Sequence, residues 1–420
     1  MTTTLKLRGS EKKGAPEPGR ASGREGTKAQ ARGSVPFDSA NLGVEVLTSR
    51  HELRAIGTEW NDLVEDSFLD TPFLRFEWLD AAWKWQHPND KPLILLIKSN
   101  GHLLGGCPLV VRHRSTRKVR IRNLEFLTVP DTQECDIVTA PTEVRENVLI
   151  RIATWMVNEF KAWDRLVLRN LPSYSDTITR LTDLFHGHGY ALEQNPDSPN
   201  YLVRTLGSWD EYYKGLGRKL KKNNNWVSNR LQKAGVVEVE WHTPSSGDFE
   251  SLFEAIGVSA NSWKGREGGS LDFPGPFAFI RQLSEHAWNA GWFSIWLLKL
   301  GDRTVAMEYQ LIYQGKVYAL RGDFDEQYSN LSPGHHLNYR ILQGLFEEEE
   351  LETYYMGPGR NGYKLRWTDE YEGQGNLTVY GRTLRSRLLR MYSRANGSRL
   401  AGLMSRGNGS APAPGKGERS

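Results

Sequence analysis

Side chains that can move protons gather in the last third of the chain. Glu308 lies within an apolar run, Asp323 and Asp325 follow the next such run, and Tyr363 and Lys364 come after a cluster of glycines. A carboxylate can take a proton from an attacking amine or hydroxyl, and a phenol or an ammonium can return one to a leaving group. We therefore predict Glu308, Asp323, Tyr363 and Lys364 as catalytic residues and Asp325 as a substrate contact.

Each of these residues also has an ordinary structural interpretation. A single acid in a strand usually faces solvent, and Asp at a strand end often makes local turn hydrogen bonds. A Lys beside a packed Tyr is common on protein surfaces. The glycines of residues 357–362 favour a site, because they let a ligand approach the backbone closely.

A candidate anion site is the predicted helix start at Ser332, Pro333 and Gly334. Pro suits the first turn of a helix, and free backbone N–H groups there attract negative charge. His335 could add a donor to a bound phosphate. The alternative is a plain helix cap with His335 in an exposed first turn.

Two further groups are candidates for substrate binding. Trp263 and Lys264 precede a glycine-rich loop, and could stack on a planar ring and pair with an anion, although Trp is more often a core residue. Residues 218–233 carry six basic side chains and no acid. That stretch could attract an acidic polysaccharide, an anionic lipid or coenzyme A (CoA), or it could be a solvated helix face.

The elements that must position these residues alternate between strands and helices. Two stretches share one order, in which helices precede a strand pair around a glycine turn, at Asn100-Gly101 and at Gly301-Asp302. A further strand and a helix follow in both. This order predicts a duplicated α/β domain, and two unrelated α/β units are the alternative.

The string that begins at Thr304 is specific. It contains residues 317–326, Ser332-Pro333-Gly334, Gly357-Pro358-Gly359 and residues 363–368. It resembles the GNAT-superfamily acetyltransferases of the CelD/BcsL type, which are associated with cellulose and exopolysaccharide synthesis and are related to the FemAB peptidyltransferases. The earlier block around Thr71-Pro72-Phe73-Leu74 resembles the family's first half more loosely.

The resemblance implies an α/β (α+β) fold of tandem GNAT-like modules, each a mostly antiparallel twisted sheet flanked by helices. It also implies an acyl-CoA co-substrate and no permanently bound cofactor, with CoA phosphate near Ser332. The strand 304–313 would then offer amides to the thioester carbonyl. Where relatives usually carry Asp, this chain has Tyr355, which puts activity in doubt if that Asp is catalytic.

Charge and composition predict four segments. Residues 1–40 form a disordered basic arm, 41–200 and 201–381 the two GNAT-like domains, and 382–420 a basic amphipathic helix with a disordered tail. The net charges of the two ends are +4 and +8, which leaves −8 for residues 41–381. A mildly acidic body argues against a nucleic-acid partner.

Several classes of protein lack support in the sequence. The spacing of Cys107 and Cys135 does not suit a zinc site. The two could form one disulfide, but we expect two reduced thiols in the core. No metal-binding pattern, membrane-spanning run or secretory signal is visible. We expect a cytoplasmic protein that could bind a membrane peripherally.

Three functions remain open. The first is acyl transfer from acyl-CoA to an amine or hydroxyl of a sugar, glycan or glycolipid precursor, with a membrane or polysaccharide-synthase contact. The second is FemAB-like aminoacyl transfer from charged tRNA, which the acidic body disfavours. The third is a non-catalytic glycan-binding accessory protein, which Tyr355 favours.

Overall fold

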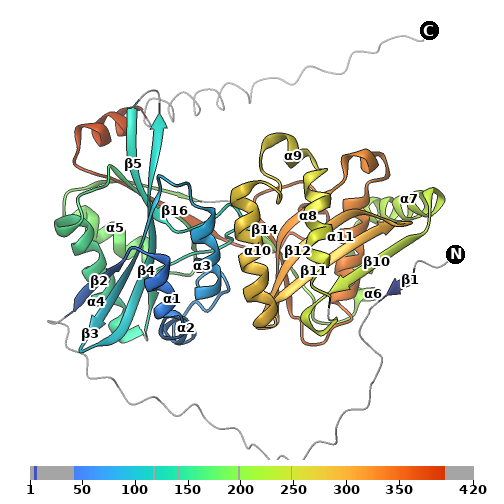
Figure 1. The fold of residues 1–420 in the computed structure, drawn as a ribbon, viewed down its shortest axis with the longest axis horizontal. Helices are drawn as coiled ribbons and strands as arrows, with labels where there is room; N and C mark the ends of the chain where they lie inside the picture. The colour runs from blue at the N-terminus through green and yellow to red at the C-terminus, as the bar shows by residue number, and fades with distance from the viewer. Residues whose placement is uncertain are drawn as a thin grey trace, which may run out of the picture.

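The chain folds into two lobes, each built on one twisted sheet covered by helices (Figure 1). The structure is a computed structural model, and it describes residues 4–6, 42–116, 119–140, 142–196, 199–246 and 248–392. We call the lobes the first and the second module, in the order of their main strands along the chain. Their sheets combine mostly antiparallel pairs with helices, so the predicted α/β (α+β) tandem fold is confirmed.

The sheet of the first module has the strand order β2-β3-β4-β5-β7-β16-β8, with β6 beside β4. Its strands are β2 (Gly43–Leu47), β3 (Lys91–Ser99), β4 (His102–Thr116), β5 (Val119–Phe126), β6 (Val138–Thr139), β7 (Arg165–Pro172), β8 (Ala191–Pro196) and β16 (Gln374–Tyr380). Its helices are α1 (Arg50–Ala55), α2 (Gly57–Glu65), α3 (Phe76–Trp85), α4 (Thr142–Thr154) and α5 (Thr177–Gly187).

The sheet of the second module has the order β1-β10-β11-β12-β13-β14-β9-β15. Its strands are β1 (Thr4–Lys6), β9 (Asn200–Arg204), β10 (Val237–His242), β11 (Phe293–Leu300), β12 (Arg303–Tyr313), β13 (Lys316–Phe324), β14 (Thr353–Pro358) and β15 (Tyr371–Glu372). Its helices are α6 (Trp209–Gly215), α7 (Arg218–Ala234), α8 (Ser251–Ala260), α9 (Trp263–Glu267), α10 (Pro274–Asn289) and α11 (Pro333–Leu345).

The two modules share a topology that the sequence only suggested. In each, four antiparallel strands lead to a parallel pair, β5 with β7 and β13 with β14, and a long helix connects the two strands of that pair. Gly101 and Gly301 both have positive φ, in the equivalent β3–β4 and β11–β12 hairpins. The repeated order of elements is therefore a repeated arrangement in space.

The modules also exchange strands. β9 follows the first module in sequence but pairs with β14 of the second, whereas β16 at the end of the second pairs with β7 and β8 of the first. Figure 1 shows β16, in orange-red, among the blue and green strands. Residues 374–380, grouped by sequence with the second domain, therefore complete the first sheet. Period-2 patterning defines a strand but not its neighbours.

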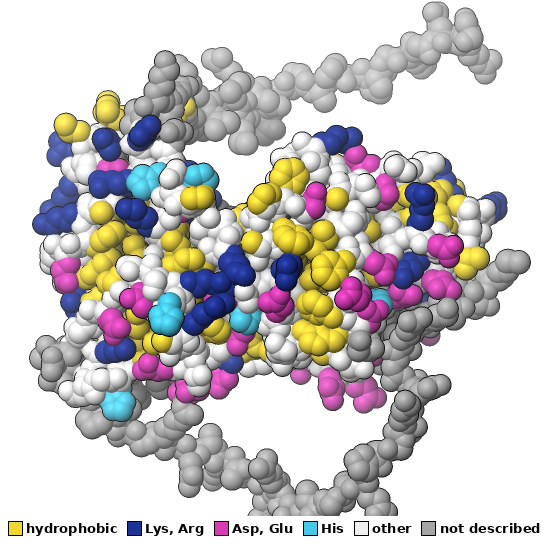
Figure 2. Space-filling view, in the orientation of Figure 1, with side chains coloured by type: hydrophobic (Ala, Val, Ile, Leu, Met, Phe, Trp, Pro, Cys, Tyr) yellow, Lys and Arg dark blue, Asp and Glu magenta, His cyan; other side chains and the backbone are white. Residues whose placement is uncertain are grey.

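The interface between the modules combines apolar and charged contacts. α3 packs on α10, where Trp78 meets Phe279 edge to face at 5.1 Å. Buried Asp80 accepts hydrogen bonds from Arg50 and Arg54 and contacts His286 of α10 at 2.8 Å. Figure 2 shows a hollow between the lobes, and a cleft of about 640 Å³ there is lined by residues of both modules.

Several other expectations can be placed. Cys107 and Cys135 are buried free thiols. Of the expected arm 1–40 only Thr4–Lys6 is described, as a strand parallel to β10, and the rest of the arm and residues 393–420 lie outside the described residues. Residues 384–392 are helical. Within the described part of the chain, no helix combines the length and the apolar character that crossing a bilayer requires.

Candidate active site

A cavity opens where β13 and β14 part. The two strands pair at three positions, from Lys316 with Thr353 to Tyr318 with Tyr355, and no further pair follows. A cavity of about 290 Å³ lies at this point between β12, β13, the start of α11 and residues 363–367. Five residues predicted from the sequence line it: Glu308, Asp323, Gly334, His335 and Tyr363.

Glu308 is a buried carboxyl in this cavity. Its Oε1 accepts hydrogen bonds from Tyr354 Oη at 2.6 Å and from Gln310 Nε2 at 2.8 Å. Oε2 lies beside Gly322, where even a Cβ would come within 3.5 Å of it. Burial raises the pKa of Glu308, and the two hydrogen bonds and the charge of Lys364 oppose that rise. A carboxyl with a raised pKa in a cavity is suited to accept and release a proton.

The hydrogen bonds around Glu308 have a fixed direction. Because Tyr354 donates its hydroxyl proton to Glu308, its oxygen accepts from Asn338 Nδ2 at 3.3 Å. This arrangement leaves Asn338 Oδ1, on the cavity wall, as a buried acceptor with no partner among the described residues. Neither Tyr354 nor Asn338 was singled out from the sequence, since an apolar strand and a helix interior contain many such residues.

Asp323 is held by an ion pair. Its carboxylate lies 2.5 Å from Lys264 Nζ and accepts a hydrogen bond from Ser259 Oγ at 2.7 Å. The structure thus joins two residues that the sequence assigned to different roles, Asp323 to catalysis and Lys264 to substrate binding. Their mutual neutralisation favours a positioning role for Asp323, on the wall of the cavity.

Lys364 stabilises the loop behind the cavity. Its ammonium donates to the carbonyl oxygens of Gly357, Pro358 and Gly359 at 2.6, 3.0 and 3.3 Å. Burial lowers the pKa of Lys364 from 10.5 to about 8, against the pull of Glu308. The side chain is not among the cavity-lining residues, whereas that of Tyr363, whose pKa burial raises, does line the cavity.

The start of α11 offers few free amides. Ser332 has a left-handed conformation, and its carbonyl accepts from the amides of His335 and His336. Pro333 has no N–H, so Gly334 supplies the free amide of the first turn. His335 contacts Asn223 and Asn224 through Nε2, and burial and the charge of Arg366 lower its pKa, so its ring is neutral at pH 7.

Other predicted residues lie outside the cavity. Asp325 caps a 3₁₀ turn by accepting the amide of Gln327, which is the turn role weighed as its alternative. Trp263 is exposed at the start of α9. β12 is paired on both edges, so the unpaired edge that faces the gap belongs to β13 rather than to the strand 304–313.

Tyr355 faces away from the site. Its ring stacks on Tyr318 at 5.0 Å, and its hydroxyl donates to Glu372 on the side of the sheet that packs against the first module. Its neighbour Tyr354 points to the opposite side, towards Glu308. The hydrogen bonds around Glu308 therefore do not include position 355.

Comparison with known proteins identifies the domain that contains the cavity. Residues 218–365 match the family model described as "Acetyltransferase (GNAT) domain". The matched residues all belong to the second module, from α7 onwards. The match includes β13, α11 and β14, and hence the gap and all the cavity-lining residues except Arg366 and Trp367. Nothing in it tests the CelD/BcsL type, which stays a prediction. A search of curated proteins finds no match.

Solved structures match this chain at low sequence identity and at TM-scores below 0.5. FemX matches at 11% identity and a TM-score of 0.49, with 83% of this chain and 99% of that chain covered. The C-terminal domain of a putative lysylphosphatidylglycerol synthetase from Agrobacterium fabrum matches at 12% identity and a TM-score of 0.49, with 81% of this chain and 95% of that chain covered. A tandem GNAT protein from the clavulanic acid biosynthesis pathway matches at 9% identity and a TM-score of 0.47, with 81% of this chain and 99% of that chain covered.

Proposed function

We propose that this protein transfers an acyl group from acyl-CoA to an amine or hydroxyl of a sugar, glycan or lipid-linked precursor in envelope or exopolysaccharide biosynthesis. The observation that carries the proposal is the buried carboxyl of Glu308 in a cavity beside the gap between β13 and β14 of a GNAT domain. In the reaction, the acceptor N or O bonds to the acyl carbon, the C–S bond breaks, and CoA leaves as its thiol.

Two side chains can move the protons. Glu308, when ionised, takes a proton from the attacking group, and its hydrogen bonds from Tyr354 and Gln310 hold the carboxylate in place. Tyr363 lines the cavity as a neutral phenol and can give its proton to the leaving thiolate. Proton transfer from Glu308 back to Tyr363, directly or through solvent, completes the cycle.

Thiol release from acetyl-CoA and longer acyl-CoAs tests the proposal, with amino sugars, glycans and lipid-linked sugars as acceptors. We expect Glu308→Gln to lower kcat by about 10²–10⁴-fold and to leave acyl-CoA affinity in calorimetry unchanged. Glu45→Gln, at an exposed ion pair with Lys98 on β2, is the control and should keep the full rate. A Glu308→Gln enzyme with an unaltered rate and pH profile would remove Glu308 as the base.

A further inference from the structure

A second, larger groove lies beside the site, between α7 and the segment after Lys364. Its volume is about 830 Å³, and its lining includes Lys219, Lys222, Asn223, Trp226, Leu365 and Arg366. α7 precedes β10 in the chain and packs on α11. The groove therefore borders the helix whose start forms one wall of the smaller cavity.

The groove and the cavity meet at shared residues. Arg366 lines both of them. His335 on the cavity wall contacts Asn223 of the groove, with Nε2 and Nδ2 3.0 Å apart. A ligand whose reactive end lies next to Glu308 could thus extend past Arg366 into the groove.

The groove presents unneutralised positive charge. No Asp or Glu belongs to its lining, and within the described residues no ion pair involves Lys219, Lys222 or Arg366. Isolated cations that converge on one hollow attract an anion that carries more than one charge. The start of α11, with its one free amide at Gly334, offers far less for a pyrophosphate than these side chains do.

The groove also has a surface for a planar ring. The Trp226 side chain is 52% exposed, and the guanidinium of Arg230 lies 4.8 Å from its ring centroid. A Trp ring has two faces, so a base can stack on the face that Arg230 does not cover. Leu365, also exposed, adds apolar area to the opposite wall.

We infer that this groove binds the phosphorylated nucleotide end of the acyl carrier, with the phosphates at Lys219, Lys222 and Arg366 and the base on Trp226. The inference rests on the proposed function, in which the carrier is acyl-CoA. A volume of about 830 Å³ lies within the range of small-molecule sites. A single hollow of this size suits one nucleotide, so we favour the nucleotide over a tRNA.

Calorimetry with CoA, dephospho-CoA and pantetheine tests the assignment on the full chain. We expect Lys219→Gln with Lys222→Gln to weaken CoA binding by at least about tenfold, since charge-assisted contacts are lost. Lys233→Gln removes one such charge from the far end of α7, outside the groove lining, and CoA affinity should stay within about twofold of the wild type. Trp226→Ala should weaken CoA but not pantetheine, which has no base.

The outcomes separate this inference from the proposed function. If CoA binds to the wild type but the groove variants bind it as tightly as Lys233→Gln does, the groove assignment is wrong and the acyltransferase proposal stands. If the wild type binds neither CoA nor acyl-CoA, both fail. If charged tRNA or anionic vesicles bind through Lys219 and Lys222 while CoA does not, the groove serves another ligand. Circular dichroism of each variant excludes unfolding as the cause.

Discussion

The two modules repeat one arrangement of strands, yet only the second keeps the gap at its parallel pair open. In the first module, β5 ends soon after it pairs with β7, and residues 132–135 then fill the space along β7. The amide of Cys135 donates to the carbonyl of Asn170, and Asn170 Nδ2 donates to the carbonyl of Thr132. In the second module the corresponding edge of β13 faces the cavity that contains Glu308.

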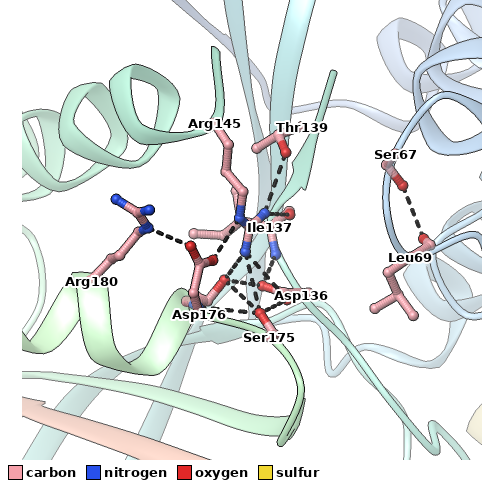
Figure 3. Close-up of polar contacts among 10 residues, drawn as sticks. Ser67, Leu69, Asp136, Ile137, Thr139, Arg145, Ser175, Asp176 and Arg180 are labelled. Atoms are coloured by element: carbon pink, nitrogen blue, oxygen red, sulfur yellow. Dashed lines mark hydrogen bonds and ion pairs between the residues drawn. The ribbon is translucent and has the colours of Figure 1, made fainter. Parts of the chain in front are cut away.

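The helix starts differ in the same way. Figure 3 shows Arg145, from the first turn of α4, directed into a cluster formed by Asp136, Ser175 and Asp176. Its Nε lies 2.7 Å from Asp176, and it donates to Thr177 at 2.6 Å, while Asp136 is fully buried. Gly334 and His335 occupy the first turn of α11, beside open space. In the first module a loop and a buried ion pair thus fill the region that is open in the second.

The largest expected effect comes from removing Arg145 from its buried cluster in the first module. Arg145→Met strands the buried carboxylate of Asp136, whose pKa burial already raises, and we expect a loss of about 3–5 kcal/mol in unfolding free energy. Urea denaturation measures it. Adding Asp136→Asn should restore part of the loss because the stranded charge is gone. If Arg145→Met costs less than 1 kcal/mol, the cluster does not hold the first module closed.

In the open site, Tyr354→Phe should change catalysis more than stability. The Tyr354 hydroxyl lowers the pKa of Glu308, so its loss lets burial raise that pKa further. We expect the acidic limb of the pH profile of kcat/KM to move up by about one pH unit. At pH values below the new limb, kcat/KM should fall by up to about tenfold. An unmoved limb would mean that another group limits the rate.

Lys364 links the open site to stability at alkaline pH. Its folded pKa of about 8 lies below the value of 10.5 for an unburied lysine, so above pH 8 the unfolded chain holds a proton that the folded chain has released. Stability from this group therefore rises with pH in that window. Relative to Lys364→Met, the wild type should gain about 1.5 kcal/mol between pH 8 and 9.5 in urea titrations. A constant difference would contradict the lowered pKa.

The smallest effect is expected at Tyr355. Tyr355→Phe removes one half-buried hydrogen bond to Glu372 on the face opposite Glu308. We expect unfolding free energy to fall by about 1 kcal/mol and kcat/KM to stay within about twofold, unlike Tyr354→Phe. A loss in kcat/KM as large as that of Tyr354→Phe would show that the two faces of β14 are not separate.

Much of the site was predictable where one residue type has few uses. A single acid in an apolar strand pointed to Glu308, a Pro at a helix start to Gly334, and a cluster of glycines to Tyr363. These three residues line one cavity. The roles of Asp325 and Lys264 were harder to predict, because an Asp that caps a turn and a Lys in an ion pair look the same in sequence as residues that contact a ligand. Asn338 and Tyr354 gave no signal, since their role arises from the partner that each one meets.

Local patterning determined what the strands and helices are, because periodicity and turn residues act over a few positions. The sequence by itself therefore gave the α/β class, the repeated order and the region of the site. Long-range contacts make β9 and β16 change modules, let Lys264 neutralise Asp323, and fill one gap while the other is open. These outcomes depend on contacts between residues far apart in the chain, and no local preference encodes them.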